Sequence, residues 1–126
     1  MINGAHFLLY SKDPEADRAF LRDVLEFKSV DAGHGWLIFA LPPAEIAVHP
    51  AGDDPGAQNS GEGVAGAALY LMCDDLASTM KDLQAKKVKF SPIDEPRWGT
   101  VTTFRLPSGA NIGLYQPKHP TALNLR

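Results

Sequence analysis

The sequence contains a single cysteine, no long apolar run and no excess of positive charge. Cys73 alone cannot form an internal disulfide, which fits a reducing compartment. No apolar segment approaches the ~20 residues that span a bilayer, and the N-terminus lacks the basic and apolar regions of a signal peptide. The net charge of −3 gives no electrostatic reason for binding nucleic acid or an anionic membrane. We therefore expect a cytoplasmic protein with neither of these partners.

The length and composition indicate one small globular domain. A chain of 126 residues suits a single compact domain, or two half-size modules that share a core. The 44% of hydrophobic and 21% of charged residues are typical of globular proteins. We expect one domain over residues 1–126.

One pattern of strand and helix occurs twice in the sequence. Residues 3–10 form an apolar run that precedes Asp13, which is suited to cap the helix that Pro14 would begin. Residues 66–73 form a second apolar run, which precedes Asp75 and another amphipathic helical pattern. The repeat predicts two modules of similar structure.

The alignment of the two halves pairs chemically different side chains. Setting Asp13 over Asp75 is an offset of 62 positions (75 − 13), and it lays His6 on Ala68. Corresponding side chains of a duplicated unit lie on facing sheets, so such a pair is a natural place for a shared site. Here one partner is an imidazole and the other a methyl group, so a site at this pair lacks one donor.

Turn signals divide the rest of each half into short strands. The first helix pattern runs to Phe27, and the second begins at Asp74 or Asp75 and ends near residues 85–87. Further strands are predicted over residues 28–31, 36–41, 46–49, 88–91, 101–106 and 111–116. The resulting division is module one at about 1–50, a polar connector at about 51–64, module two at about 65–117 and a C-terminal tail at 118–126.

Landmarks along nearly the whole chain match a known family in order and spacing. They are His6, Asp13, Phe20, Val24-Leu25-Glu26-Phe27, Trp36, Phe39, Val48-His49-Pro50, Asp74-Asp75-Leu76, Trp98-Gly99, Leu106-Pro107-Ser108-Gly109 and Leu114-Tyr115-Gln116-Pro117. Together they resemble the vicinal oxygen chelate superfamily of glyoxalases, bleomycin-resistance proteins and extradiol dioxygenases. The resemblance implies an α+β fold in which two βαβββ modules pair curved mixed β-sheets around a shared cavity. It also implies a homodimer.

The resemblance implies four positions for metal ligands, two in each module. The first-strand histidine of the family matches His6, and the other three positions match Ala47, Ala68 and Gly113. These three side chains cannot bind a metal, so we expect no cofactor. The alternative is a divalent metal in a rebuilt site around His6 and His49, since His49 lies two positions after Ala47.

The same register implies a wall of a ligand cavity. Side chains alternate faces along a strand, so Tyr70 and Met72 point the same way, as do Gly113 and Tyr115. Such a wall suits an organic ligand better than a cation. The predicted ligand-binding residues are His6, Trp36, His49, Tyr70, Met72, Trp98 and Tyr115.

Three functions remain open at this point. The first is a metal-independent protein that binds a small, partly aromatic or amphipathic organic molecule, and we favour it. The second is a lyase, isomerase or dioxygenase, with the metal site around His6 and His49 or with His49 or Tyr115 as a general acid or base. The third is a catalytically silent dimeric interaction module. Each candidate residue also has a structural reading, as a core or capping side chain, and Cys73 is expected to be an inert thiol.

Overall fold

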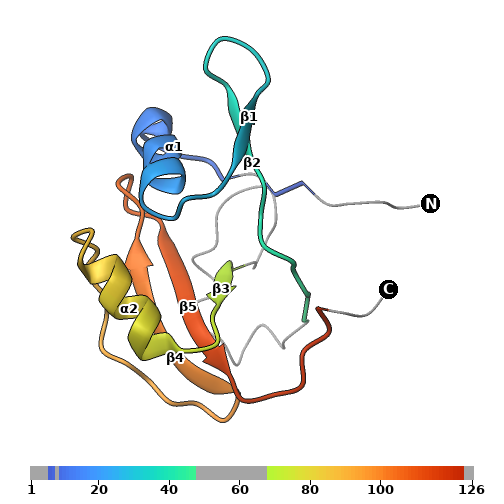
Figure 1. Ribbon diagram of the computed structural model, residues 1–126, viewed down its shortest axis with the longest axis vertical. Coiled ribbons are helices and arrows are strands. Elements are labelled where there is room, and N and C mark those ends of the chain that lie inside the picture. The colour runs from blue at the N-terminus through green and yellow to red at the C-terminus, as the bar shows by residue number, and fades with distance from the viewer. Residues whose placement is uncertain (1–5, 8, 48–67, 124–126) are drawn as a thin grey trace.

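The computed structural model describes residues 6–7, 9–47 and 68–123, and in this part the chain forms two helices and five strands (Figure 1). The first half contains helix α1 (Pro14–Asp23) and strands β1 (Ser29–Asp31) and β2 (Leu37–Phe39). The second half contains β3 (Tyr70–Met72), α2 (Leu76–Gln84), β4 (Gly99–Arg105) and β5 (Asn111–Pro117).

Both helices begin at the predicted aspartates. Asp13 Oδ1 accepts a hydrogen bond from the Ala16 N–H at 3.2 Å, and Asp75 Oδ1 accepts one from the Ser78 N–H at 3.0 Å. Each carboxylate satisfies an N–H that has no partner inside the helix and lies at the positive end of the helix dipole. The predicted helix starts are therefore confirmed. Neither helix in the described part has the length and apolarity to cross a membrane.

Helix α1 ends one turn before the predicted end at Phe27. Glu26 adopts a positive φ of 60°, which breaks the helical path. The Phe27 N–H reaches back to the Leu21 carbonyl at 3.0 Å and closes the helix end. The prediction of a helix as far as Phe27 was wrong because the apolar spacing continues into this closing turn.

Strands β1 and β2 form a hairpin around the predicted turn Gly33-His34-Gly35. Asp31 makes the turn, because its carboxylate accepts from the Gly33 N–H at 2.7 Å and from the Gly35 N–H at 3.2 Å. All three turn residues have positive φ, at 132°, 53° and 83° in sequence order, and two of them are glycines, which adopt that conformation without strain. The strands pair antiparallel with Val30 opposite Ile38.

The second half builds a three-stranded sheet in the order β3-β5-β4. β3 runs parallel to β5, with Tyr70 paired with Gly113 and Met72 with Tyr115. β4 runs antiparallel to β5 along its whole length, from Gly99 opposite Pro117 to Arg105 opposite Asn111. The predicted strands at residues 101–106 and 111–116 are confirmed, and β3 covers part of the strand predicted at residues 66–73.

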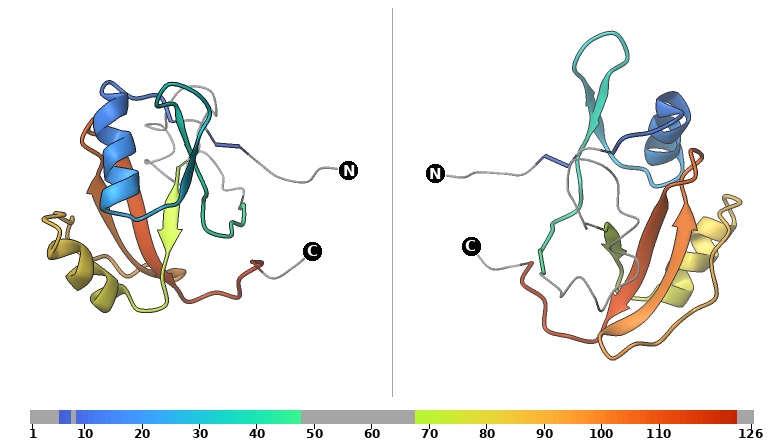
Figure 2. Two further views of the ribbon diagram at one scale, coloured as in Figure 1. Left: turned by 45° about the horizontal axis from the view of Figure 1, so that its top comes forward. Right: turned by 180° about the vertical axis from the view of Figure 1, so that it is seen from behind.

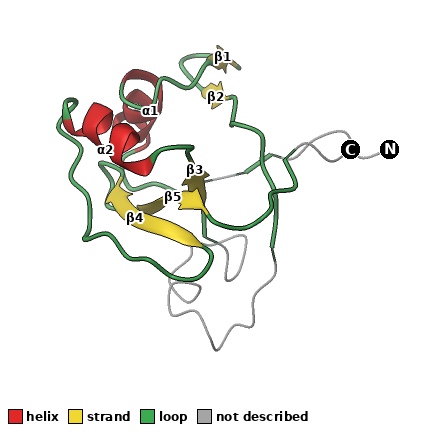
Figure 3. Ribbon diagram, turned by 60° about the horizontal axis from the view of Figure 1, so that its bottom comes forward, coloured by secondary structure: helices red, strands yellow, loops and turns green. Residues whose placement is uncertain are grey.

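Both helices lie on one side of this sheet (Figures 2 and 3). The Phe20 ring of α1 stacks on Phe104 of β4 with centroids 6.0 Å apart, so the helix of the first half covers the sheet of the second. Asp17, 6% exposed, fixes this arrangement by accepting hydrogen bonds from the Ser108 N–H at 3.0 Å and hydroxyl at 2.7 Å. The core consists of Leu76, Val88, Phe104, Leu106, Ile112 and Leu114.

Two predicted strands of the first half are not seen in the part of each that the structure describes. None of the described residues of the run 3–10 lies in a strand, and Tyr10 is 66% exposed. Ile46 and Ala47 of the predicted strand 46–49 are likewise outside any strand, and Ile46 is 92% exposed. A strand requires a neighbour for its backbone hydrogen bonds, and no described segment pairs with these two.

The strand predicted at residues 88–91 is replaced by side-chain hydrogen bonds. The Ser91 N–H donates to the Thr103 carbonyl at 2.9 Å, as a ladder requires. The Thr103 N–H, however, donates to the Ser91 hydroxyl at 2.9 Å, and the Ser91 carbonyl accepts from the Thr102 hydroxyl at 2.7 Å. These hydroxyl groups take the positions that backbone groups would fill, so only an isolated bridge between Asp94 and Val101 remains.

Candidate functional site

Three aromatic rings meet on the sheet face opposite the helices. The centroids of Tyr70 and Tyr115 are 5.8 Å apart, those of Tyr70 and Trp98 are 5.8 Å apart, and those of Trp98 and Tyr115 are 5.1 Å apart. The interplanar angles of these pairs lie between 81° and 89°, so each ring meets the other two edge to face. We call Tyr70, Trp98, Tyr115 and the adjacent His119 the aromatic cluster.

The strand register explains why these rings meet. Along β5, Ile112 and Leu114 face the helices and belong to the core, so Gly113 and Tyr115 face the other side. Tyr70 pairs with Gly113, and a Cβ atom added to that glycine would overlap the Tyr70 ring. Gly113 therefore gives the ring the space to lie flat on the strand beside Tyr115.

His119 joins the cluster from the segment that follows β5. Its ring stacks on Tyr115 with centroids 6.1 Å apart, and its Nε2 atom lies 3.2 Å from the Tyr115 hydroxyl. The segment is fixed at two further points. The Lys118 N–H donates to the Trp98 carbonyl at 2.9 Å, and the Ala122 N–H donates to the Glu45 carboxylate at 2.7 Å. The sequence analysis did not predict His119 or Glu45 as site residues.

The surroundings of Tyr115 keep its hydroxyl protonated. The residue is 8% exposed, and this burial is the largest cause that raises its pKa above the ordinary value of 10.0. The negative charge of Glu45 and the neighbouring Tyr70 raise the pKa further. Tyr115 is therefore a neutral hydrogen-bonding group at physiological pH, and it would be a poor general base.

Of the other predicted site residues, Trp36 and His6 are exposed. Trp36 is 62% exposed in the β1–β2 hairpin, where the Arg18 guanidinium lies 4.8 Å from its ring centroid. His6 is exposed, and His49 lies outside the described residues. Of the seven predicted ligand-binding residues, the structure brings together Tyr70, Trp98 and Tyr115, with Met72 paired to Tyr115 in the strand register.

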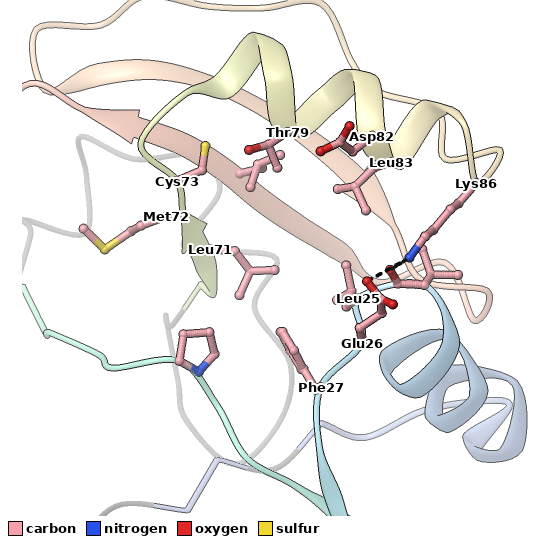
Figure 4. A pocket seen from close by; sticks show the side chains of 13 residues that line it. Leu25, Glu26, Phe27, Leu71, Met72, Cys73, Thr79, Asp82, Leu83 and Lys86 are labelled. Atoms are coloured by element: carbon pink, nitrogen blue, oxygen red, sulfur yellow. Dashed lines mark hydrogen bonds and ion pairs between the residues drawn. The ribbon is translucent and has the colours of Figure 1, made fainter.

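A cavity lies at the β3 edge of the sheet, on the helix side (Figure 4). Its volume is about 490 Å³, and apolar side chains of β3, α2 and the segment that follows α1 line it, among them Leu25, Leu71 and Leu83. Lys86 lies at one end, where its ammonium contacts the Glu26 carboxylate at 3.2 Å and donates to the Val24 carbonyl at 3.1 Å. Met72, one of the predicted ligand-binding residues, also lines this cavity. The predicted cavity between two sheets stays a prediction, because its facing wall includes residues outside the description.

The side chains at the four positions that the resemblance implied for metal ligands are poor in donors. No group of three or more His, Cys, Asp or Glu side chains among the described residues could hold a metal ion. Ala47, Ala68 and Gly113 offer no side-chain donor, and the Tyr70 ring fills the space beside Gly113. The donor set that the structure describes does not fit a metal centre.

Cys73 follows β3 and its thiol is partly buried. Its Sγ atom lies 3.5 Å from the Tyr115 carbonyl. Burial is the largest cause that raises the pKa of the thiol above its ordinary value of 9.0, and Asp74 and Asp75 add to it. A thiol in this state is a weak nucleophile.

Comparison with known proteins identifies the family. The profile of the Glyoxalase/Bleomycin resistance protein/Dioxygenase superfamily matches residues 4–114, so the chain belongs to that superfamily and the predicted resemblance is confirmed. The comparison with curated proteins gives no match.

Solved structures share the fold. TnmS3, an antibiotic binding protein from Streptomyces sp. CB03234, superposes with a TM-score of 0.64 at 22% identity, covering 94% of this chain and 99% of that one. Lactoylglutathione lyase from Agrobacterium tumefaciens gives a TM-score of 0.61 at 17% identity, covering 90% of this chain and 92% of that one. A superfamily member from Sphaerobacter thermophilus DSM 20745 gives a TM-score of 0.56 at 20% identity, covering 91% of this chain and 98% of that one. The α+β fold is therefore glyoxalase-like, with a βαβββ module.

Proposed function

We propose that the protein binds a small, partly aromatic or amphipathic organic molecule at the aromatic cluster, and that it does so without a metal. The observation that carries this proposal is the position of Tyr70, whose ring lies over Gly113. In metal-using members that the chain resembles, a glutamate ligand matches Gly113. An aromatic surface thus stands where a metal ligand would project.

The chemistry of the cluster supports a flat ligand. Tyr70 is 38% exposed and is held edge to face against Trp98 and Tyr115. Rings in fixed orientation stack on flat molecules and lose little conformational freedom on binding. The fold shared with TnmS3, which is an antibiotic binding protein, is consistent with a binding role. A role for His6, Trp36, His49 and Met72 in the same site stays a prediction.

The chain's two tryptophans allow a direct test. A panel of flat aromatic compounds, including 2-naphthol and anthraquinone-2-sulfonate, is titrated into the protein while tryptophan emission is recorded. We expect saturable quenching that survives in Trp36→Phe and is lost in Trp98→Phe. N-acetyltryptophanamide corrects for light absorbed by the compound. Absence of saturation across the panel, with no rise in melting temperature at high ligand concentration, contradicts the proposal.

Metal content tests the second claim of the proposal, that the protein binds its ligand without a metal. The protein is purified without chelator and without a histidine tag, and its metals are measured. We expect much less than one divalent ion per chain. Stoichiometric metal that is lost in His6→Ala or His49→Ala would instead favour the lyase, isomerase or dioxygenase.

We also propose a cytoplasmic homodimer in which a second copy covers the apolar side chains of the first half. Val30 is 66% exposed and Trp36 is 62% exposed in the β1–β2 hairpin, and Ile46 is 92% exposed. Covering these exposed side chains would remove apolar surface from water, which favours association. Light scattering is expected to give twice the mass of the chain. Val30→Lys is expected to dissociate the dimer, whereas Ser29→Lys, at the neighbouring exposed position, is not.

A further inference from the structure

The hydrogen bonds of His119 fix which of its ring nitrogens carries the proton. Nδ1 lies 2.8 Å from the Pro120 carbonyl oxygen. A peptide carbonyl can only accept a hydrogen bond, so Nδ1 must be the protonated nitrogen. In a neutral imidazole the other nitrogen is then bare. Nε2 of His119 is therefore an acceptor.

This assignment also fixes the direction of the hydrogen bond to Tyr115. The Tyr115 hydroxyl lies 3.2 Å from Nε2, so the phenol donates and the imidazole accepts. The raised pKa of Tyr115 keeps that proton on the oxygen. A phenol has one proton, and here it is committed to His119. Within the described residues the hydroxyl makes no second hydrogen bond, so its remaining capacity is to accept one.

The position of His119 is set by the segment around it. The Lys118 N–H donates a hydrogen bond to the Trp98 carbonyl, and the Ala122 N–H donates one to the Glu45 carboxylate. The ring is therefore fixed on both sides along the chain, and it stacks on Tyr115. A ligand that lies on the exposed Tyr70 ring stands next to the Tyr115 ring, whose centroid is 5.8 Å away.

We propose that His119 determines the specificity of the aromatic cluster. His119 accepts the hydrogen bond from the Tyr115 hydroxyl, which leaves the phenol oxygen able only to accept a further one. The site therefore prefers flat ligands that carry an O–H or N–H donor over ligands of the same shape that can only accept. This inference rests on the proposed function, because it concerns the ligand of the same site.

The first experiment compares two ligands that share a flat body. 2-Naphthol can donate a hydrogen bond, whereas 2-methoxynaphthalene can only accept one. At about pH 8, where imidazoles are ordinarily neutral, we expect the naphthol to bind about five- to tenfold more tightly, the size of one net hydrogen bond. Equal affinity for the two contradicts the proposal while leaving the proposed function intact.

Variants separate a specificity role from a structural one. Tyr115→Phe removes the acceptor, so the preference for naphthol is expected to vanish. His119→Phe keeps a stacking ring but frees the Tyr115 proton, so the variant is expected to gain affinity for 2-methoxynaphthalene. A residue that only supported the fold would weaken both ligands equally. Tyr10→Phe, which removes a hydroxyl from an exposed tyrosine, serves as the control and is expected to keep the wild-type preference.

The tautomer is measured directly and without ligand. The ¹⁵N chemical shifts of His119, assigned by comparison with His119→Phe, are expected to show a protonated Nδ1 and a bare Nε2 at the same pH. A protonated Nε2 overturns the inference even if ligands bind. Should neither naphthalene compound bind, the result counts against the proposed function, and the ¹⁵N shifts still decide the state of His119.

Discussion

Tyr70 and Gly113 are register partners across β3 and β5, and the tyrosine ring lies where a side chain at position 113 would begin. The ring position depends on the missing Cβ atom. It also places Tyr70 in edge-to-face contact with both Trp98 and Tyr115. One glycine thus permits the contacts of Tyr70 in the aromatic cluster.

Adding a methyl group at position 113 is expected to displace the Tyr70 ring. Gly113→Ala should lose the two ring contacts of Tyr70, and each such contact contributes about 0.5–1.5 kcal/mol, so we expect a loss of about 1–3 kcal/mol in the free energy of unfolding. Urea denaturation measures it. In a Tyr70→Ala background the same change should cost little, because no ring remains to displace. Additive effects of the two substitutions would show that they do not interact.

The contact between Asp17 and Ser108 is expected to stabilise the packing of α1 on the sheet. Asp17→Ala removes two hydrogen bonds to a buried carboxylate, and we expect a loss of about 2–3 kcal/mol, measured by urea denaturation. Ser108→Ala keeps the backbone N–H donor and should cost about half as much. The matched control is Asp23→Ala, which removes an exposed carboxylate that, among the described residues, pairs only with the neighbouring Arg22. This substitution should leave the unfolding midpoint unchanged.

Stability is expected to fall at alkaline pH because of Tyr115. The folded pKa is raised above 10.0, chiefly by burial, so the folded state holds the proton more tightly than the unfolded chain does. This contribution is fully present below the unfolded pKa and is lost as the pH rises through the folded one. The urea midpoint, followed from about pH 8 to 11, should decline less in Tyr115→Phe. The pKa of Cys73 is also raised in the folded state, so its thiol adds a loss of stability at alkaline pH. Both proteins should therefore carry Cys73→Ala.

Cys73 is expected to react slowly with alkylating agents. Its pKa is raised above 9.0, mainly by burial, so little thiolate is present at neutral pH. Iodoacetamide labelling at about pH 7.5 should be several-fold slower in the folded protein than in urea. Mass spectrometry of the single cysteine gives both rates. Folded-state labelling as fast as in urea would mean that the thiol is exposed and ordinary, contrary to the prediction of an inert thiol.

The sequence predicted best those features that depend on neighbouring residues. The caps Asp13 and Asp75 and the turn at residues 33–35 act over four residues or fewer, and the structure confirms them. Strands need distant partners, and this is where prediction was weakest. The run 3–10 has the apolar pattern of a strand without a described neighbour, and Ser91 replaces a ladder bond with its hydroxyl.

The candidate site also contains residues that the sequence predicted and residues that it missed. The register that the family resemblance implied, with alternation along each strand, placed Tyr70 and Tyr115 on one face, and the pairing of β3 with β5 agrees. His119 was missed because its contact with Tyr115 depends on how the chain turns after β5, and no periodic pattern encodes that turn. The ligand contact of Trp36 stays a prediction. Its place at a strand end suggested that contact, and the structure shows the Arg18 guanidinium 4.8 Å from its ring centroid.

The covering of Gly113 by Tyr70 has an evolutionary consequence. A carboxylate at position 113, matching the glutamate of metal-using members, would collide with the Tyr70 ring and would have to displace it. That displacement would come at the expense of the edge-to-face contacts that Tyr70 makes with Trp98 and Tyr115. Positions 70 and 113 are therefore expected to change together, and ancestral reconstruction should find that the tyrosine and the glycine arose together.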